Sequence, residues 1–549
     1  VRFKNDRFGL FFLSGMTTLI FLALPVHTEV VANIKGRDEI FSLLGSLVAF
    51  YYLMKAMGIP KAKSGALDAN LEEDASKKRL LNLALSGLFF FLALLSKENA
   101  ITFLAIIPVG LVLLQGRKIG EVLIRMLPIF GATIVFIFIR ASILGWSLGD
   151  PPQELMNNPY LKLVGNQYLP FTFSEKLATI TFTMGKYLQL MIAPLVLTHD
   201  YYPKHIDLMS WTDWRVLLSL LLYLAIIGFA LLRFRKFPVL AWSVLFYIAA
   251  LSIVSNIVFP VGVHMSERFI YMPSIGFALA MSVLLYRFAQ RLQGEKPKLQ
   301  EMILPMGILG LFLLFFTVKT VHRNFAWKSN FTLFLTDIKT SVNSAKLQNA
   351  VGGELINTAL VLKNEKLRIL PPGASPAQID PIEAAFVAEV QKAEPHLLKA
   401  IELHPSFASP YLLLGNAYNY LDRFDESIQY YNQAMVYKNP YPEAERNMGK
   451  TYLDGGRFFG EKQQSFQKAI QWLTQAERFS TNDQTEIKRL KALCYASLGN
   501  LQQAIPLLEE VIKTAPTKSS LTNLASMYQS IGNLERANQL NAQAAQTQE

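Results

Sequence analysis

The amino-acid sequence predicts an all-α protein in two parts, a polytopic bundle of transmembrane helices followed by an α-solenoid. The chain has 549 residues, of which 52% are apolar and only 17% are charged, an apolar composition for its size. Nearly all long apolar runs lie in the first ~325 residues, as expected of membrane helices. From about residue 345 the sequence repeats every 33–34 residues, which is typical of helical repeat arrays. We therefore expect a membrane domain over 1–325, a connector over 326–344 and a repeat domain over 345–549.

Ten apolar runs are candidate membrane helices, because each approaches the length that crosses about 30 Å of hydrocarbon. They are 8–24, 40–57, 80–95, 100–115, 122–144, 177–197, 216–232, 237–259, 272–290 and 302–320. The run 177–197 differs from the others because it contains Gly185, Lys186 and Pro194. It also follows a long polar segment, 145–175. We expect this run to lie in the outer interface or to re-enter the bundle, so that nine runs cross.

The positions of lysine and arginine support this count and orient the bundle. Short loops rich in these residues are cytoplasmic in most membrane proteins. The basic segments of this chain are Arg2–Arg7, 55–79, Gly116–Lys118, Arg233–Lys236 and 287–298. These five basic segments fall on the same side of the membrane only if the run 177–197 does not cross it. The repeat domain then lies on the outer side of the membrane.

The net charge of +12 does not indicate a nucleic-acid partner. The basic residues are spread over short loops between apolar runs and do not gather on one amphipathic face, so nucleic-acid binding is excluded as a function class. The single cysteine, Cys494, rules out an intrachain disulfide. This favours a bacterial inner membrane with periplasmic repeats, and an endoplasmic reticulum membrane with lumenal repeats is the alternative.

The repeats have the spacing of tetratricopeptide hairpins. The segment Leu414–Tyr418 recurs as Met448–Tyr452, and again around Tyr495 and Tyr528. Small residues follow where the second helix of each hairpin must approach the first, at Ser427, Ala434, Ala504 and Ala537. Prolines end the repeats at Pro405, Pro440 and Pro516. Arrays of this kind stack into a curved solenoid with a binding face, so we expect the repeats to bind a peptide or protein.

Polar residues concentrate in the turns on the outer side. These turns contain His27–Glu39, Ser96–Asn99, Thr198–Tyr202 and His264–Ser274. Ionisable groups at the mouth of a helix bundle are costly to keep there, so they indicate a functional site. The alternative for the first turn is a charged interfacial cap on two helices. No zinc spacing, P-loop, nucleotide fingerprint or nucleophile elbow is present in the sequence.

The outer turns interleave acids with bases. The carboxylates are Glu29, Asp38, Glu39, Glu98, Asp200, Asp207 and Glu267, the cations are Arg37, Lys97 and Arg268, and the histidines are His27 and His264. Carboxylates suit general-base work on a hydroxyl, and a cation near the membrane surface suits a phosphate leaving group. This combination fits a sugar donor with a lipid tail and a phosphate, and a hydroxyl acceptor on an exported chain.

The same motifs carry a family resemblance. Pro25–Glu29, Gly36–Glu39, Ser96–Glu98, Asp200–Tyr201, Glu267–Ser274 and Arg323–Trp327, followed by tetratricopeptide repeats, resemble the TMTC family in the same order. The resemblance implies a GT-C fold and protein O-mannosyltransfer. It also implies a polyprenyl-phosphate sugar donor and a Ser or Thr hydroxyl of an exported protein as acceptor. Neither the residues nor the resemblance decides whether a divalent metal is needed.

The sequence departs from the family pattern at three places. Leu24 stands where the family usually has a histidine, and Asp38 replaces an alanine, so that Glu39 takes the acidic position. GT-C enzymes carry a key acid in the first outer loop, after the first membrane helix. We expect that helix and loop upstream of Val1, so that the chain as given lacks its own catalytic base.

The resemblance assigns roles to individual residues. The candidate catalytic residues are Glu29, Glu39 and Glu267. They would orient the basic side chains of the outer turns or the sugar hydroxyls. The candidate substrate-binding residues are His27, Arg37, Lys97, Glu98, Asp200, Tyr201 and Arg268. For each acid and base the alternative is a structural ion pair, and for His27 it is a helix cap or a packing role.

Two functions compete at this stage. The first is a GT-C glycosyltransferase that moves a mannose-like sugar from a polyprenyl-phosphate to hydroxyls of exported proteins recruited by the repeats. The second is a non-catalytic membrane scaffold that anchors a peptide-binding array. A transporter would show an inverted internal repeat or paired broken helices, and the sequence shows neither.

Overall fold

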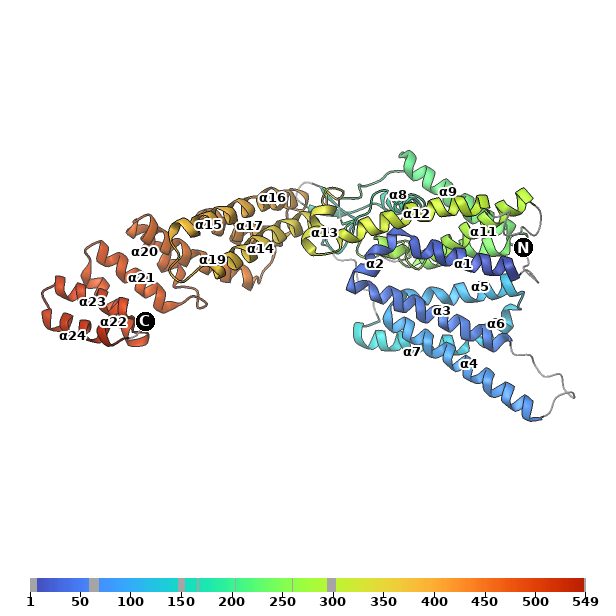
Figure 1. Ribbon diagram of the computed structural model, residues 1–549, viewed down its shortest axis with the longest axis horizontal. Coiled ribbons are helices and arrows are strands. Elements are labelled where there is room, and N and C mark those ends of the chain that lie inside the picture. Colours follow the sequence, from blue (N-terminus) through green and yellow to red (C-terminus); the bar gives the residue numbers. More distant parts are fainter. Residues whose placement is uncertain are drawn as a thin grey trace. The chain divides into compact units, whose positions relative to one another are not determined.

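The fold class predicted from the sequence is confirmed: a bundle of long apolar helices precedes a solenoid of helical hairpins (Figure 1). The computed structural model describes residues 7–58, 69–146, 154–164, 167–202, 204–258, 260–293 and 303–547. It divides into two units, Val1–Ser344 and Ala345–Glu549. Several of the predicted cytoplasmic basic residues lie outside the described ranges, namely Arg2, Lys4, Lys61, Lys63, Lys296 and Lys298.

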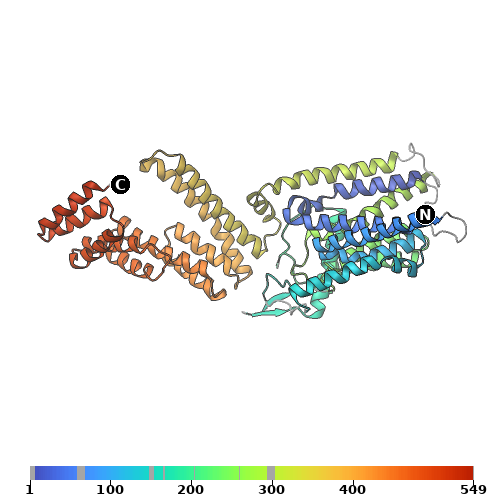
Figure 2. The same cartoon turned by 90° about the horizontal axis from the view of Figure 1, so that it is seen from below.

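The helices of the first unit run side by side along the bundle (Figures 1 and 2). They are α1 Arg7–Ala23, α2 Thr28–Ala32, α3 Arg37–Gly58, α4 Ala69–Ser96, α5 Phe103–Gln115, α6 Ile119–Arg125, α7 Leu127–Leu144, α8 Phe173–Ile192, α9 Trp214–Arg233, α10 Pro238–Ser252, α11 Ser274–Gln293, α12 Ile303–Ala326 and α13 Asn330–Asp337. Short 3₁₀ turns adjoin several of them: η1 Pro25–His27, η2 Ile34–Gly36, η3 Glu98–Thr102 and η4 Glu267–Ile270.

Six helical segments among the described residues are long and apolar enough to cross a membrane. They are Ile34–Gly58, Glu73–Ser96, Glu98–Gln115, Leu127–Leu144, Trp214–Arg233 and Ile303–Ala326. A seventh results if Gly9–Ala23 and Pro25–Ala32, which meet at an angle of 57°, form one broken span. The chain is therefore a multi-pass membrane protein.

Two of the nine expected crossings lie on helices that do not meet the same requirement of length and composition. Helix α10 has only 15 residues, and α11 has 20 residues but includes Arg287 and Arg291. Both pack inside the bundle, α11 between α1 and α10. Helix α8, on the run expected not to cross, also lies outside the set of candidate spans. Nine crossings remain a prediction.

The connections show at which end of the bundle the segment between α7 and α9 begins and ends. The C-terminal part of α7 lies beside the end of α4, because Arg140 pairs with Glu98. Helix α9 starts at the end of the bundle where α10 finishes, since the two are joined by a short turn after Arg233. The segment between α7 and α9 thus leaves from and returns to the same end of the bundle. Two strands in this segment, β1 Leu161–Val164 and β2 Gln167–Pro170, form an antiparallel hairpin that the sequence did not predict (Figure 2).

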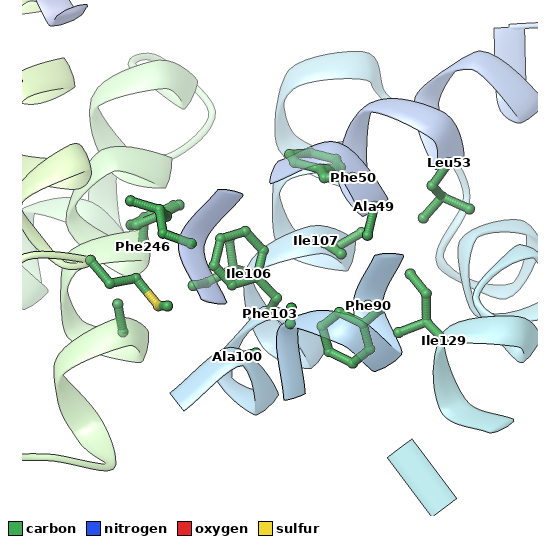
Figure 3. Packing of buried hydrophobic residues seen from close by; sticks show 14 of the residues in the cluster. Ala49, Phe50, Leu53, Phe90, Ala100, Phe103, Ile106, Ile107, Ile129 and Phe246 are labelled. Carbon is green, nitrogen blue, oxygen red and sulfur yellow. The ribbon is translucent and has the colours of Figure 1, made fainter. Parts of the chain in front are cut away.

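Helices α3 and α4 pack closely against each other within the bundle. Gly45 allows α3 to approach α4, because a Cβ there would lie 2.9 Å from that of Ala93. The hydroxyl of Ser86 donates a hydrogen bond to the Ala49 carbonyl across the same pair of helices (2.8 Å). Figure 3 shows the buried core that these helices share with α5, α7 and α10: Ala49, Phe50, Leu53, Phe90, Ala100, Phe103, Ile106, Ile107, Ile129 and Phe246.

The second unit consists of helices α14 to α24, most of them in antiparallel pairs. They are α14 Ala345–Ile369, α15 Pro376–Gln391, α16 Ala393–Leu403, α17 Ala408–Tyr420, α18 Phe424–Tyr437, α19 Pro442–Arg457, η6 Phe458–Lys462 (a π-helical turn), α20 Phe466–Ala476, α21 Gln484–Ser497, α22 Leu501–Thr514, α23 Lys518–Ser530 and α24 Leu534–Gln546. Helices α14 and α16 pack against each other, and α15, which lies between them in sequence, packs on α14.

Small residues let the two helices of each hairpin approach each other. Gly415 lies against the ring of Tyr431, so any side chain at this position would displace that ring. Ser427 is fully buried, and its hydroxyl donates to the Gly415 carbonyl (2.7 Å). Ala434 and Ala504 are fully buried at the corresponding sites. These contacts explain why small residues recur at this spacing.

Candidate functional site

Four segments that are far apart in the sequence meet at the end of the bundle where α3 begins. They are the turns between α1 and α3, the junction of α4 and η3, residues 198–202 and η4. Each is fixed by a helix end, so the backbone of the bundle determines which polar side chains meet. The region is called the outer cluster below, after the side to which the sequence assigns it.

In the first part of the outer cluster, Lys97 forms ion pairs with two acids of α3. Its Nζ lies 2.7 Å from Oε1 of Glu39 and 3.1 Å from Oδ2 of Asp38. Glu39 is almost completely buried, and Asn99 donates to its other oxygen over 3.4 Å. A carboxylate this deep needs a cation and hydrogen bonds to stay charged, and Lys97 and Asn99 supply both. The pairing of Lys97 with the α3 acids was not predictable from their sequence positions.

Glu29 and Arg268 form the second part. The carboxylate of Glu29 accepts hydrogen bonds from the Ser266 hydroxyl (3.2 Å) and from the Arg268 backbone N–H (3.0 Å). The Arg268 Nε lies 3.9 Å from Glu29 Oε1, which is an ion pair without a hydrogen bond. This Nε is buried and has no hydrogen-bond partner in the described part of the chain. The charge of Arg268 also acts on Glu39, so the first two parts are electrostatically connected.

Glu267 forms the third part, next to Arg268 in sequence. Its Oε1 accepts hydrogen bonds from the Thr198 backbone N–H (2.7 Å) and from the Tyr201 hydroxyl (3.0 Å). Its Oε2 is buried and without a partner among the described residues. Burial raises the pKa of Glu267 to about 8, against the opposing effect of the Arg323 charge. Glu267 therefore holds a proton at neutral pH.

Two candidate residues have local structural roles. His27 is buried between the rings of Phe21 and Tyr271, at centroid distances of 4.5 and 4.7 Å. Its Nε2 is hydrogen-bonded to the Ser274 hydroxyl (2.9 Å). Asp200 accepts a hydrogen bond from the Tyr202 backbone N–H (2.8 Å), which is the pattern of an Asx turn. These contacts agree with the packing alternative for His27.

Two other candidates lie at the surface of the cluster. Glu98 is half exposed and pairs with Arg140 of α7 (2.9 Å), a contact that turns it away from Lys97. Arg37 begins α3 with an exposed side chain, and its guanidinium has no ion pair or hydrogen bond within the described ranges, while its backbone N–H donates to the Ile34 carbonyl. An exposed cation without a partner, one residue before a buried acidic cluster, is available to an anionic ligand.

Gly36 fixes the distance between Glu29 and α3. A Cβ on residue 36 would overlap the backbone of Val30, which cannot yield as a flexible side chain would. We expect Gly36→Ala to lower the free energy of unfolding by about 1–3 kcal/mol, the usual range for overpacking. Denaturation in detergent measures this, with Gly15→Ala as the control because a Cβ there meets no atom within 4 Å. Equal stability of the two variants would contradict the predicted overlap.

A further group lies next to the outer cluster and consists of His199, Arg323 and Asp337. The sequence did not single out this group. Arg323 binds both oxygens of Asp337, and His199 binds the same carboxylate through its backbone N–H (2.8 Å) and its Nδ1 (2.6 Å). Burial would raise the pKa of Asp337, but hydrogen bonds from Arg323 and His199 hold it at about 2. His199 adjoins Asp200 in a motif visible in the sequence, whereas no sequence signal marked Asp337 in the connector.

The outer cluster has the chemistry to bind a phosphate and a hydroxyl. In the part of the chain that the structure describes, the buried donor Arg268 Nε and the buried oxygen Glu267 Oε2 have no hydrogen-bond partner, and both are costly to leave without one. Within the described ranges, no three His, Cys, Asp or Glu side chains are grouped so that they could hold a metal ion.

Comparison with known proteins agrees with the sequence motifs. A family model described as tetratricopeptide repeat matches residues 408–435 and 490–518. Human protein O-mannosyl-transferase TMTC3 is 24% identical over 453 residues, which cover 77% of this chain and 42% of that protein. Tmtc3 of Drosophila melanogaster is 24% identical, with 78% and 44% covered, and mouse TMTC4 is 26% identical, with 62% and 47% covered. These relatives confirm the resemblance to TMTC proteins.

The chain spans less than half the length of these curated relatives. They are animal proteins, and nothing in them supports the expectation of a bacterial source. Among solved structures, YrrB, a TPR protein with an unusual peptide-binding site, is 21% identical with a TM-score of 0.25, covering 38% of this chain and 90% of its own. Human IFIT1 with m7Gppp-AAAA is 14% identical with a TM-score of 0.20, covering 92% and 94%. At these scores neither likeness bears on function.

Proposed function

We propose that this chain is a GT-C membrane glycosyltransferase that moves a mannose-like sugar from a polyprenyl-phosphate to hydroxyls of exported proteins. The observation that carries the proposal is the outer cluster, in which three buried carboxyl groups meet two cations at one end of a membrane bundle. Among the described residues neither Arg268 Nε nor Glu267 Oε2 has a hydrogen-bond partner, which supports a ligand there. The names of the TMTC relatives favour O-mannosyltransfer as the reaction.

The cations would bind the donor phosphate. Arg268 would use its unpartnered Nε, and Arg37 its exposed guanidinium, since arginine can clamp phosphate through parallel hydrogen bonds. Lys97 would act mainly as a point charge, because Asp38 and Glu39 already hold its ammonium. A lipid tail in the bilayer would leave the phosphate at the depth of the helix ends that form the cluster.

The carboxyl groups would bind and polarise the sugar. A protonated Glu267 can donate a hydrogen bond from Oε2 to a sugar hydroxyl or to the phosphate oxygen that leaves with the lipid. Glu29 and Glu39 would hold Arg268 and Lys97 in place. The repeats of the second unit would recruit the acceptor, because stacked hairpins present an extended surface for peptides.

Transfer of labelled mannose from polyprenyl-phosphate mannose to a Ser/Thr-rich peptide, by the full-length protein in lipid vesicles, tests the proposed function. We expect label on the peptide, dependent on donor and on protein. Peptide binding without transfer from either mannosyl or glucosyl polyprenyl-phosphate would overturn the proposal and favour the alternative, a membrane-anchored scaffold.

Arg37→Gln is expected to raise the KM for the lipid-phosphate donor about tenfold, since a hydrogen bond to a charged group contributes about 1.5–3 kcal/mol. The kcat should change little, because the same contact exists in ground and transition states. The control is Lys35→Gln, which removes an exposed charge from the same turn. Donor titration at fixed acceptor measures both constants. An unchanged KM in Arg37→Gln would exclude Arg37 from the phosphate site.

A further inference from the structure

The first helices of successive hairpins in the second unit adjoin one another. Helix α14 packs on α17, α17 on α19 and α19 on α21, in addition to the pairing inside each hairpin. In a solenoid, helices that adjoin from repeat to repeat form the inner side of the curve, the side on which extended partners bind. The surface of these first helices is called the inner face below.

Asparagine side chains of the inner face join neighbouring first helices. Asn349 of α14 donates from Nδ2 to the Ser409 hydroxyl of α17 (3.2 Å), and Asn447 of α19 donates from Nδ2 to Oδ1 of Asn416 on α17 (2.8 Å). Asn523 of α23 corresponds to Asn447, because each precedes the recurring tyrosine of its repeat by five residues. All four asparagines are partly exposed. The inner face therefore carries a row of amide groups.

Two amide oxygens of this row are left without a donor. In the part of the chain that the structure describes, Oδ1 of Asn349 and Oδ1 of Asn419 are buried and have no hydrogen-bond partner. The orientation of the Asn419 amide is determined by Asp454 of α19, because a carboxylate only accepts hydrogen bonds and so takes the Nδ2–H (3.3 Å). A buried carbonyl oxygen without a donor costs free energy until a ligand supplies an N–H or O–H.

A side-chain amide has the same hydrogen-bonding groups as a peptide unit, a carbonyl acceptor and N–H donors. An extended peptide offers one main-chain N–H and one C=O at every residue other than proline, so it matches a row of amides on adjoining helices. The alternative is that the asparagines only join the hairpins. That role is complete with the Nδ2 contacts and gives no use to the two oxygens of Asn349 and Asn419.

We propose that the inner face binds an extended segment of the acceptor protein through its main chain, with Asn349 and Asn419 accepting peptide N–H groups. That the bound segment is the acceptor rests on the proposed function, whereas the binding itself does not. Recognition through the main chain does not depend on the order of the side chains. One array of repeats then recruits acceptors of different sequence.

Binding of fluorescent peptides to the full-length protein in detergent, without any sugar donor, tests the proposal. The peptides are a Ser/Thr-rich peptide, a peptide of the same composition in scrambled order, and the first peptide with alternate main-chain amides replaced by esters, which lack the N–H. Asn349→Ala and Asn419→Ala are compared with Asn432→Ala, because Asn432 is exposed on α18, the second helix of its hairpin. Thermal unfolding of each variant is measured alongside.

We expect the scrambled peptide to bind within twofold of the original and the ester peptide to bind at least tenfold more weakly. Asn349→Ala and Asn419→Ala should each raise the Kd about fivefold, the usual scale for one hydrogen bond between neutral groups, at an unchanged melting temperature. The esters should cost less affinity in each of these variants than in the unmodified protein, because one N–H acceptor is already gone. Asn432→Ala should bind all three peptides as the unmodified protein does.

Three results would overturn the proposal. They are a scrambled peptide that binds more than fivefold more weakly, an ester peptide that binds as tightly as the original, and variants of Asn349 and Asn419 that bind like Asn432→Ala. Sugar transfer is a separate measurement. Its absence while the peptides bind as expected contradicts the proposed function and leaves recognition through the main chain in place.

Discussion

Glu267→Gln should lower sugar transfer by about 100-fold, because the substitution removes the only proton on the Oε2 side of the carboxyl group. Glutamine keeps the Oε1 acceptor for the Thr198 N–H and the Tyr201 hydroxyl, so the local fold should survive. The amide cannot donate a proton to a leaving group. Transfer of labelled mannose from the polyprenyl-phosphate donor measures the effect.

The pH dependence gives a sharper result than the rate alone. Burial raises the pKa of Glu267 to about 8, so the protonated, active form dominates below this pH. Activity of the unmodified chain should fall as the pH rises through about 8, and the residual activity of Glu267→Gln should not.

The matched control is Glu121→Gln, in the exposed pair that Glu121 forms with Arg117 (3.7 Å) away from the outer cluster. It should leave the rate and the pH profile unchanged. If Glu267→Gln were to transfer sugar within threefold of the unmodified chain, a role for Glu267 in proton donation would be excluded.

Asp337→Ala should lower the free energy of unfolding by about 3–5 kcal/mol, because it leaves the buried Arg323 guanidinium without its anion. Asp337 accepts hydrogen bonds from both Arg323 and His199, so one substitution removes the centre of the whole group. The lost energy comes mainly from the uncompensated buried charge. Chemical denaturation of the full chain in detergent measures it.

An exposed ion pair serves as the comparison. Asp74 binds Lys78 at 2.6 Å, but both side chains are more than half exposed, so Asp74→Ala should cost less than about 1 kcal/mol. A similar small cost for Asp337→Ala would show that water reaches the Arg323 guanidinium.

Much of this molecule could be predicted from local sequence. The apolar runs predicted the long helices, and the period of 33–34 residues predicted the hairpins of the second unit. The neighbouring acids and bases predicted that the outer turns come together, as they do, while their role as a site stays a prediction. One apolar run proved to be two helices, α6 and α7, which divide just before Pro128. The antiparallel strand hairpin was missed because its four-residue strands lie in a segment dominated by polar residues.

The individual partners could not be predicted in this way. Glu29 binds Ser266 and Arg268 across more than 230 residues, and His199 binds Asp337 across 138. Glu98 was expected beside Lys97 as a substrate contact, yet it lies at the surface against Arg140, and its role stays a prediction. Only the packed bundle determines whether an acid faces its neighbour in sequence, a distant helix or solvent.

The sequence by itself determined the membrane helices, the repeats and the side of the bundle that carries charge, since apolar length, helical period and turn composition act over short stretches. The tertiary structure decided which acid has its pKa raised by burial, which arginine Nε has no hydrogen-bond partner among the described residues, and which histidine is held by a buried carboxylate. The physical reason is that burial removes water from a charge only after distant segments have packed around it. The free energy of that charge then depends on whichever groups the fold has placed within a few ångströms.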